Sequence, residues 1–465
     1  MTSAVTAAPW SGPVDLPLGG ELDVQAACGL MHVHGRRFGR PTALGLDYAS
    51  IVAAELDEIG RSALEVARLR GVPLEAVTTS VAQAALLAVS QYLAAATADE
   101  PDPAPAEVGG PPFLSADGVA FEVEALDAEV WRRFWAALDA DPRVVASAWR
   151  PFQQRFATAT CPLPPELTGL TARLPVVRLE RVAESTGMTL VRVAHRAVDD
   201  VPPYVVRPLG AAAGPVGGGA PDPGALPLSG LVVLESCRRV QGPVAGHLLW
   251  QLGATVVRVE PPGGDPLRGV PPMAGDVSAR FHAVNRGKRV VTADLGTVAG
   301  RRELLELASG ADVFLHNWAP GKAAAWSLRA RDVARVRPGI VYAHASGWGD
   351  ALGPRPPLGT DFVVQAHAGV PPSLMTTVDV FGGVVCARGV VDALAERIRS
   401  GTGRAVASSL LSAASRLNAR ATRRCTAPLS VPVCTDLAEL ARDRRFSRAL
   451  VSDGCVVPGS AWRFG

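Results

Sequence analysis

The chain has 465 residues, of which 48% are apolar and only 19% are charged, and its formal net charge at pH 7 is +2. This length allows two or three domains, each with a core of its own. The near-neutral balance argues against a nucleic-acid-binding protein, whose signature is a clustered basic surface, and the sequence has no acidic or basic tail.

The composition also argues against export and membrane insertion. The first twelve residues lack a charged region followed by an apolar core, so we expect no signal peptide. The apolar run 81–96 is interrupted by Gln and Ser and is too short to span a bilayer. The seven cysteines form no CxxC pair and the eight histidines form no metal-ligand pattern, so we expect a reduced, cytoplasmic protein without a metal site.

In chain order, the first feature is an internal repeat. After an irregular arm over residues 1–18, the sequence GGELDVQAACG from Gly19 aligns without a gap to GTDFVVQAHAG from Gly359, which places Glu21 opposite Asp361. PTALGLDYASIVAAE from Pro41 then aligns, with a small gap, to PPSLMTTVDVFGGVVCA, which places Asp47 opposite Asp379. A helix is predicted after each copy, over 51–70 and 384–399.

The middle of the chain predicts a smaller domain between two Pro- and Gly-rich linkers. The first linker covers 99–112, and the second, 206–228, reads as a flexible connection. Between them we expect strands within 113–121, an amphipathic helix over 128–139, a helix near 176–184 and a strand over 189–194.

The second half of the chain opens with a βαβ pattern. An apolar run at 231–235 is followed by Gly242-Pro243, a helical pattern over 244–252 and a β-branched run at 254–259. A right-handed crossover makes such strands parallel. Ligands of parallel sheets bind beyond the carboxyl ends of the strands, here near 238–242 and Arg258. The GxGxxG fingerprint of dinucleotide-binding proteins is missing from this stretch.

Five segments in order carry a family resemblance: GPVAGHLLWQLGATVVRVEPPGGDPLRG, NRGKRVVTADL, ADVFLHNWAPG, RPGIVYAHASGWGDALGP and GTDFVVQAHAG. Together they resemble the class III CoA-transferases, a family that includes formyl-CoA and carnitine CoA-transferases and alpha-methylacyl-CoA racemases. The resemblance implies an α/β fold, with a Rossmann-like large domain around a parallel sheet, a smaller α+β domain and an interlocked homodimer. The expected division is 1–98 (partial repeat of the large domain), 113–205 (small α+β domain), 206–228 (linker), 229–420 (Rossmann-like CoA-binding domain) and 421–465 (closing segment).

The resemblance also implies catalytic residues. In this family an aspartate before the repeat-region helix is acylated by the substrate, and Asp379 matches it, with Asp47 at the same place in the duplicate. A nucleophilic carboxylate needs an open approach, which Gly382-Gly383 fits. An aspartate at a helix start is also an ordinary N-cap. Asp361 matches a further acidic position at the active site, as does Glu21 in the duplicate.

For coenzyme A, the family's contacts fall on two strand ends and two loops. Basic side chains there suit the phosphates of CoA, and an aromatic ring suits its adenine. The structural alternative is a solvated strand edge for the basic residues and a core position for the aromatic residue. The family usually has a basic residue a few positions after the HNWAPG segment, and this chain has Ala325 there. The residues carried over are Val240, Gln241, Arg258, Lys288, Arg289, Asn317 and Trp318.

The resemblance therefore implies an enzyme that moves CoA between an acyl-CoA and a carboxylic acid through an aspartyl-acyl anhydride, with small molecules as its partners. One alternative is an isomerase, racemase or dehydratase-like enzyme acting on a CoA- or carrier-bound acyl group. The racemases carry a histidine where this chain has Thr360, which weakens that alternative. The other alternative is a non-catalytic family member. Whether a site forms within one chain or across a dimer stays open at this stage.

Overall fold

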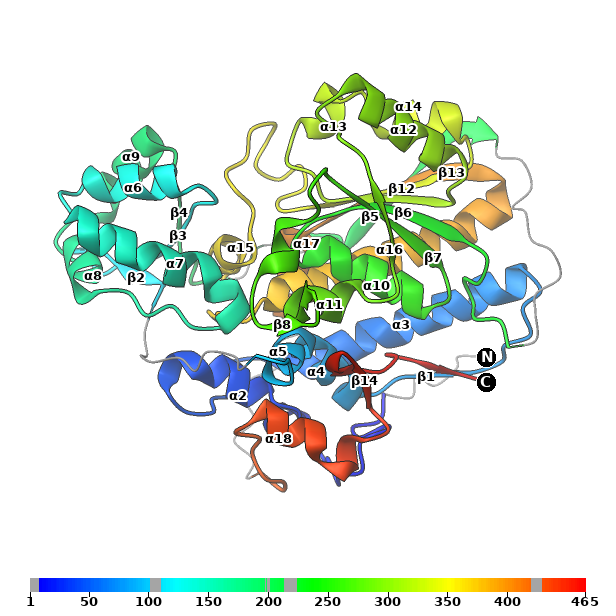
Figure 1. Cartoon of the computed structure of the whole chain (residues 1–465), viewed down its shortest axis with the longest axis horizontal. Helices are drawn as coiled ribbons and strands as arrows, with labels where there is room; N and C mark the ends of the chain where they lie inside the picture. The colour runs from blue at the N-terminus through cyan, green and yellow to red at the C-terminus, as the bar shows by residue number, and fades with distance from the viewer. Residues whose placement is uncertain (1–7, 101–109, 197, 199–200, 213–223, 420–428) are drawn as a thin grey trace.

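The computed structural model of the chain describes residues 8–100, 110–196, 198, 201–212, 224–419 and 429–465. Its centre is a seven-stranded sheet in the order β10-β7-β6-β11-β12-β13-β5 (Figure 1). Six neighbouring strands run parallel, and only the edge strand β5 is antiparallel to its neighbour β13. The strands are β5 (Tyr204–Ala212), β6 (Val232–Ser236), β7 (Thr255–Glu260), β10 (Arg289–Thr292), β11 (Val313–His316), β12 (Val341–Ser346) and β13 (Thr402–Ser409).

Helices cover both faces of this sheet, so its strands are apolar on both sides. In Figure 1, α12, α13 and α14 lie above the sheet, and α10, α11 and α16 lie below it. The predicted βαβ unit is present, because β6 and β7 pair in parallel across α10. The helices are α10 (Gln241–Gln251), α11 (Ala279–Asn285), α12 (Val298–Ser309), α13 (Lys322–Ala325), α14 (Ala330–Val336), α15 (Asp361–Ala368), α16 (Thr377–Ser400) and α17 (Leu410–Ala419).

The N-terminal unit packs under this sheet domain. Its long helix α3 lies along α16, and the apolar side chains of α3 join the same core as those of α10 and α16. The short strand β1 pairs with β16 near the end of the chain. The elements are α1 (Glu21–Ala27), α2 (Leu30–Gly35), η1 (Arg36–Phe38), α3 (Tyr48–Leu69), β1 (Val77–Thr78), α4 (Val81–Ala88) and α5 (Ser90–Ala96).

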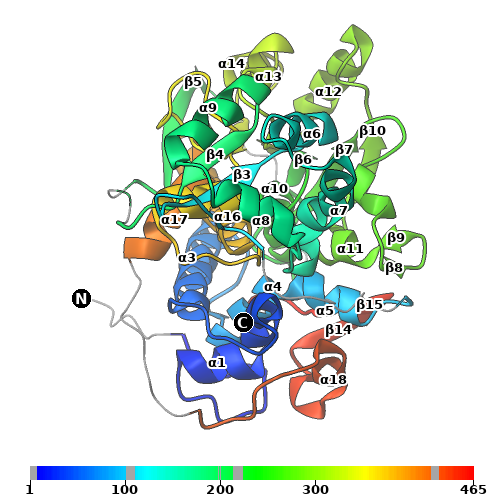
Figure 2. The ribbon, with the colours of Figure 1, turned by 90° about the vertical axis from the view of Figure 1, so that its left-hand side faces the viewer.

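The small domain stands to one side of the sheet domain, at the left of Figure 1 and nearest the viewer in Figure 2. Its antiparallel sheet β2-β3-β4 is covered by helices that bury Trp131 and Trp135. The indole N–H of Trp131 donates to the carbonyl of Val145 at 3.0 Å, which satisfies its polar atom inside this core. The elements are β2 (Phe113–Leu114), β3 (Ala120–Glu124), α6 (Ala128–Ala136), α7 (Pro142–Thr158), α8 (Pro165–Thr171), α9 (Val176–Thr186) and β4 (Thr189–Arg192).

The stretch predicted as the linker 206–228 begins instead with a strand of the main sheet. Residues up to 212 belong to β5, in a register that sets Tyr204 against Ser408. Pro208 is tolerated there because β5 is an edge strand, whose outer N–H groups need no partner strand. Residues 213–223 of that linker, and 101–109 of the first linker, lie outside the described residues.

The remaining elements close the underside of the molecule. The last segment contributes a short helix and a hairpin near α5, and a second small hairpin precedes α11. None of the helices in the described ranges has the length and apolar character needed to cross a membrane. These elements are η2 (Pro266–Gly269), β8 (Met273–Ala274), β9 (Val277–Ser278), α18 (Leu437–Arg442), η3 (Arg444–Phe446), β14 (Leu450–Asp453), β15 (Cys455–Pro458) and β16 (Arg463–Phe464).

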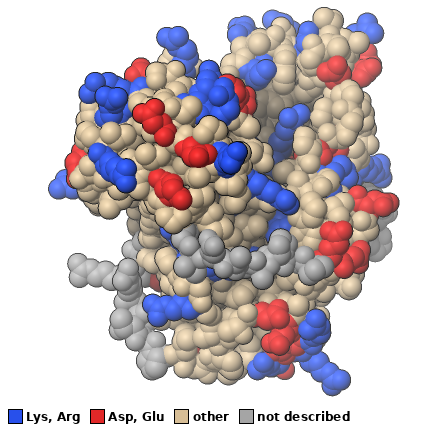
Figure 3. Space-filling model, turned by 60° about the vertical axis from the view of Figure 1, so that its left-hand side comes forward, with Lys and Arg blue, Asp and Glu red and all other residues tan. Residues whose placement is uncertain are grey.

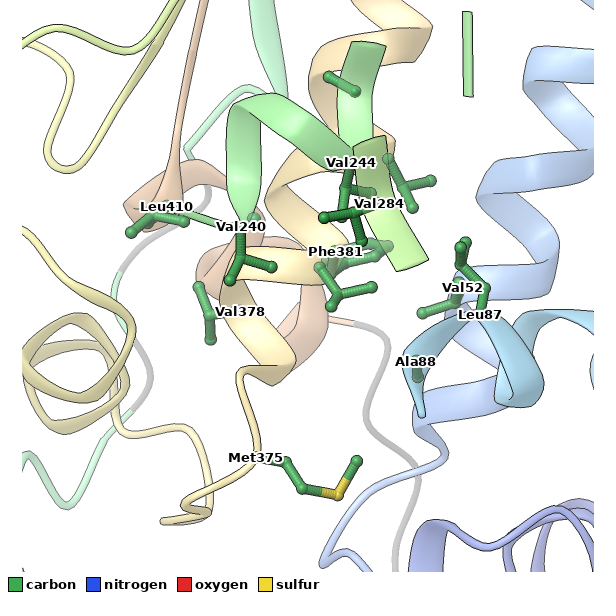
Figure 4. Packing of buried hydrophobic residues seen from close by; sticks show 14 of the residues in the cluster. Val52, Leu87, Ala88, Val240, Val244, Val284, Met375, Val378, Phe381 and Leu410 are labelled. Atoms are coloured by element: carbon green, nitrogen blue, oxygen red, sulfur yellow. The ribbon is translucent and has the colours of Figure 1, made fainter. Parts of the chain in front are cut away.

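Two glycines set the distance between α10 and α16. A Cβ added to Gly383 would lie 2.6 Å from the carbonyl oxygen of Gln241 and 2.7 Å from Cβ of Val244. At Gly382 an added Cβ would lie 3.0 Å from the side chain of Leu410. Figure 4 shows the apolar side chains that meet at this crossing. The glycines therefore allow close packing of two helices, and the expectation that they leave an approach for substrate is wrong.

Replacing Gly383 with Ala is expected to destabilise the protein by ~1–3 kcal/mol, because the added methyl group forces two packed helices apart. The measurement is urea unfolding followed by circular dichroism. Gly169→Ala in α8 is the matched control. Apart from the backbone of its own helix, no described atom lies within 4 Å of the point where its Cβ would stand, so we expect little change or a gain of up to ~1 kcal/mol. A Gly383→Ala protein as stable as the wild type would contradict the close crossing.

Candidate active site

A cavity of about 500 Å³ lies between the small domain and the sheet domain. Figure 3 shows the surface hollowed between these two lobes, with basic side chains along the rim. The small domain contributes the end of β3 and the second half of α7. The sheet domain contributes the β6–α10 turn, η2 and the first residues of α15 and α16. The cavity thus lies beyond the carboxyl end of β6, at the edge of the sheet that the βαβ pattern indicated.

Asp361 and Asp379 meet in this cavity, as the sequence predicts. The backbone N–H of Asp379 donates to Oδ2 of Asp361 at 2.6 Å. Burial raises the pKa of Asp379 to about 7, an effect that the charge of Arg239 opposes and that of Glu124 reinforces. Burial also raises the pKa of Asp361, and the adjacent Asp379 raises it further. Ionisation of one of these carboxyl groups therefore opposes ionisation of the other.

Glu124 and Arg155 of the small domain complete this wall of the cavity, and neither was predicted from the sequence. The Thr360 hydroxyl, at the start of α15, donates to Glu124 at 2.6 Å, and Arg155 donates to the same carboxylate at 3.1 Å. These contacts join the small domain to α15. The signal in the sequence was an acidic residue at the end of the strand pattern AFEVE, directly before the loop that leads to α6.

The internal repeat is present in the structure as two similar hydrogen-bond networks. The amide of Gln25 donates to Glu21 at 2.8 Å, and the amide of Gln365 donates to Asp361. Each carboxylate then accepts backbone N–H groups from the first turn of the long helix that follows, α3 or α16. Glu21 and Asp361 therefore occupy equivalent places, as the ungapped alignment predicts.

The second part of the alignment is wrong by three residues. Asp47 and Thr376 are the N-cap residues of α3 and α16, with nearly identical φ and ψ of −79° and 60° against −77° and 57°. Ser50, rather than Asp47, then lies opposite Asp379: its backbone N–H and its hydroxyl both donate to Glu21, at 2.8 and 2.5 Å. The gap was misplaced because the loop before α3 is longer than the loop before α16. Asp47 lies outside the residues that line the cavity.

Three of the residues expected to contact CoA lie together at the β6–α10 turn. Val240 lines the cavity, and the amide of Gln241 donates to the backbone at the end of β12 at 3.3 Å. Asn317 clamps the turn, since its side chain accepts the N–H of Arg238 at 3.0 Å and donates to the Arg238 carbonyl at 2.8 Å. This clamp joins the loops after β6 and β11.

Two further residues predicted to contact CoA, Trp318 and Arg289, lie outside the cavity. Trp318 donates through its indole N–H to the hydroxyl of Ser236 at 3.0 Å, and its ring packs on His316 with centroids 4.4 Å apart. Arg289 is exposed at the start of β10. The described residues contain no cluster of three His, Cys, Asp or Glu side chains that could hold a metal ion.

Arg258 and Lys288 belong to a buried ion network. The Arg258 side chain is 1% exposed, and its three nitrogens donate to Glu235, Glu260 and Asp265 at 2.5–3.1 Å. Lys288 donates to Glu235 at 2.8 Å, and burial lowers the pKa of this lysine to about 8. Both cations are therefore held by carboxylates beneath the surface, and their direct contact with a phosphate remains a prediction.

Arg258→Met is expected to destabilise the protein by ~3–5 kcal/mol, because it leaves three buried carboxylates without their shared cation. The free energy of urea unfolding measures the effect. Arg302→Met on the surface of α12, where the side chain is 78% exposed, is the control and should change stability by less than ~0.5 kcal/mol. Equal stabilities for the two variants would contradict a structural role for Arg258.

Comparisons with known proteins find a family match in the second half of the chain. A family model described as CoA-transferase family III matches residues 228–432. A probable fatty acyl-CoA transferase of Mycobacterium tuberculosis, Rv3272, is 37% identical over 197 residues, which are 38% of this chain and 48% of that protein. The acetyl-CoA:oxalate CoA-transferase of Acetobacter aceti is 33% identical over 192 residues, 38% of this chain and 49% of that protein.

Among solved structures, a crystal structure of Rv3272 is 35% identical and superposes with a TM-score of 0.39, covering 42% of this chain and 58% of that one. The chain spans about half the length of the curated relatives that it matches. The matching half carries Asp361, Asp379 and the β6–α10 turn. The segment 228–432 is therefore homologous to CoA-transferase family III, and this homology covers about 40% of the chain.

Proposed function

We propose that this protein transfers CoA from an acyl-CoA to a carboxylic acid, with Asp379 as the group that is transiently acylated. The observation that carries the proposal is the pair of Asp361 and Asp379 at the cavity, within the segment that belongs to CoA-transferase family III. The relatives named above are transferases of this type by name, and their substrates differ.

The proposed reaction uses Asp379 as a nucleophile in three steps. Its carboxylate attacks the thioester carbonyl, so that a C–O bond forms, the C–S bond breaks and CoA leaves as the thiolate. The carboxylate of the acceptor acid attacks the carboxyl carbon of the acylated Asp379 and displaces the donor acid. The CoA thiolate then attacks the acceptor's acyl carbon, which forms the new thioester and regenerates the Asp379 carboxylate.

The surroundings of Asp379 suit this role. The N–H···O bond to Asp361 fixes the first turn of α16, so that the nucleophile is held in place before substrate binds. Burial raises the pKa of Asp361 and the charge of Asp379 raises it further, so Asp361 can stay protonated while Asp379 is ionised.

Thr360 supports a transferase over a racemase. In the racemases of this family a histidine stands at this place as a candidate base for proton exchange at an α-carbon. Thr360 has no such group, and its hydroxyl already donates to Glu124. The cavity and its acidic pair likewise favour an enzyme over a non-catalytic family member.

We further propose that one chain supplies both walls of the site. The small domain and the sheet domain that line the cavity come from the same chain, joined through Thr360 and Glu124. In the duplicate, Ser50 takes the place of the nucleophile and donates its hydroxyl to Glu21. Of the two repeat copies, only the second then carries a carboxylate at the reactive position. A homodimer remains a separate prediction.

Asp379→Asn should lose at least ~10⁴-fold in transfer activity, because the amide cannot form the acyl anhydride. The direct measurement is mass spectrometry of tryptic peptides after incubation with acetyl-CoA or succinyl-CoA, with the added acyl mass expected on the peptide that contains Asp379. Asp47→Asn is the matched control and should be acylated like the wild type. Acylation at Asp47, or none in the wild-type protein, would contradict the proposal.

The rate of acylation should rise with pH and reach half its maximum near pH 7. The ionised form of Asp379 is the attacking species, and its raised pKa of about 7 means that it ionises through this range. Glu124→Gln removes a negative charge that raises the pKa of Asp379 and should move the midpoint to lower pH. Stopped-flow measurement of thiolate release between pH 5 and 9 gives both profiles, and a flat wild-type profile would exclude Asp379 as the titrating nucleophile.

A further inference from the structure

Three arginines line the cavity, and they differ in what holds them. Arg155 is buried, donates to Glu124 and lies over the rings of Phe152 and Phe362. Arg238 and Arg239 are exposed in the β6–α10 turn. Within the described parts of the chain, neither of these two guanidinium groups has a hydrogen bond or an ion-pair partner. The cavity therefore has two available cations beside its acidic pair.

Arg239 is the one that acts on the nucleophile. Its positive charge opposes the effect of burial on the pKa of Asp379, and no such effect is found for Arg238. Its backbone has a φ of 65°, in a region that non-glycine residues seldom occupy. The clamp of Asn317 on the main chain of Arg238 holds the turn in this conformation. Strained backbone of this kind is kept where surrounding contacts enforce it, often at functional sites.

We propose that Arg239 binds the carboxylate of the incoming acid and holds it beside the acylated Asp379. This inference rests on the proposed function. An acceptor carboxylate loses hydration when it enters this cavity, where Glu124 already supplies another carboxylate, so a cation beside it is favourable. A guanidinium suits this task because its paired N–H donors match the geometry of a carboxylate.

The order of the reaction supports this assignment. Before acylation, the charge of Arg239 in the same cavity favours the ionised form of Asp379. Acylation makes the Asp379 side chain neutral, so the positive charge of Arg239 can then pair with the carboxylate of the acceptor. One oxygen of the acceptor can then accept from the guanidinium while the other attacks the anhydride. The attack forms a C–O bond to the carboxyl carbon of Asp379 and releases the donor acid as its carboxylate.

The experiment separates acylation from discharge. Wild-type protein and Arg239→Gln are acylated with radiolabelled acetyl-CoA or succinyl-CoA, and free CoA is removed by rapid gel filtration. Acetate, oxalate, succinate or glutarate is then added, and release of the labelled donor acid is followed over time. All steps are run at pH 8.5, so that Asp379 is ionised in both proteins despite the higher pKa expected without Arg239.

Arg239→Gln should still be acylated but should need roughly 10- to 100-fold more acceptor acid for half-maximal discharge, as expected for the loss of a charged hydrogen bond. Arg239→Lys should recover part of this loss, since it keeps the charge without the paired donors. The Arg239 side chain has no hydrogen-bond or ion-pair partner among the described residues, so the substitution should not disturb folding. Normal acylation of the variant checks that it is folded.

Two results would overturn the inference and leave the transferase intact. One is an acylated Arg239→Gln protein that discharges like the wild type. The other is an equal loss in Arg238→Gln, which would mean that the overall charge of the cavity matters rather than this residue. Failure of the wild-type protein to become acylated by either donor would instead overturn the proposed function, and the inference with it.

Discussion

The hydrogen bond from the backbone N–H of Asp379 to the carboxylate of Asp361 is the contact on which the site depends. Helix N-termini carry N–H groups without intrahelical partners and a partial positive charge, so a buried carboxylate is stabilised there. This bond attaches α16 to α15, and Thr360 attaches α15 to Glu124 of the small domain. A short chain of polar contacts therefore fixes the walls of the cavity and the nucleophile together.

The two copies of the repeat show how the same contact can serve a different purpose. Glu21 accepts backbone N–H groups from the first turn of α3, as Asp361 does from the first turn of α16. The residue at the reactive position differs, with Ser50 in one copy and Asp379 in the other. In the first copy the hydroxyl of Ser50 satisfies the carboxylate of Glu21. That copy keeps the structural half of the arrangement, and its helix α3 supports α16 from the side.

Local sequence pattern was sufficient where one short stretch sets the structure. The alternation of apolar runs with Gly-Pro predicted β6, α10 and β7, and the repeated acid-and-amide spacing predicted the equivalence of Glu21 and Asp361. Local pattern gave wrong or incomplete predictions where contacts with residues distant in the sequence determine the structure. Arg258 has an ordinary strand pattern around it, and its burial depends on Glu235 and on Asp265 in the following loop.

The same limit explains the other errors. The strand β5 has a proline and lies in a Gly-rich region, and only its pairing with β13 reveals it. From the sequence, Gly382 and Gly383 were expected to leave room for substrate, and only the packing of α10 against them shows that this space is filled. The register of Asp47 depended on a gap that sequence could not position. Glu124 has its role only because the small domain folds back onto α15.

The packing of α3 against α16 has a consequence for synthesis on the ribosome. Arg388 in α16 pairs with Glu55 in α3, 333 positions away, so the two helices meet only late. At the usual 5–20 residues per second, roughly 15–60 s pass between completion of α3 and emergence of its partner. During that interval the apolar face of α3, with Ile51, Val52 and Leu56, lacks its native cover. A nascent chain with such an exposed apolar face is prone to aggregation until the second half has been synthesised.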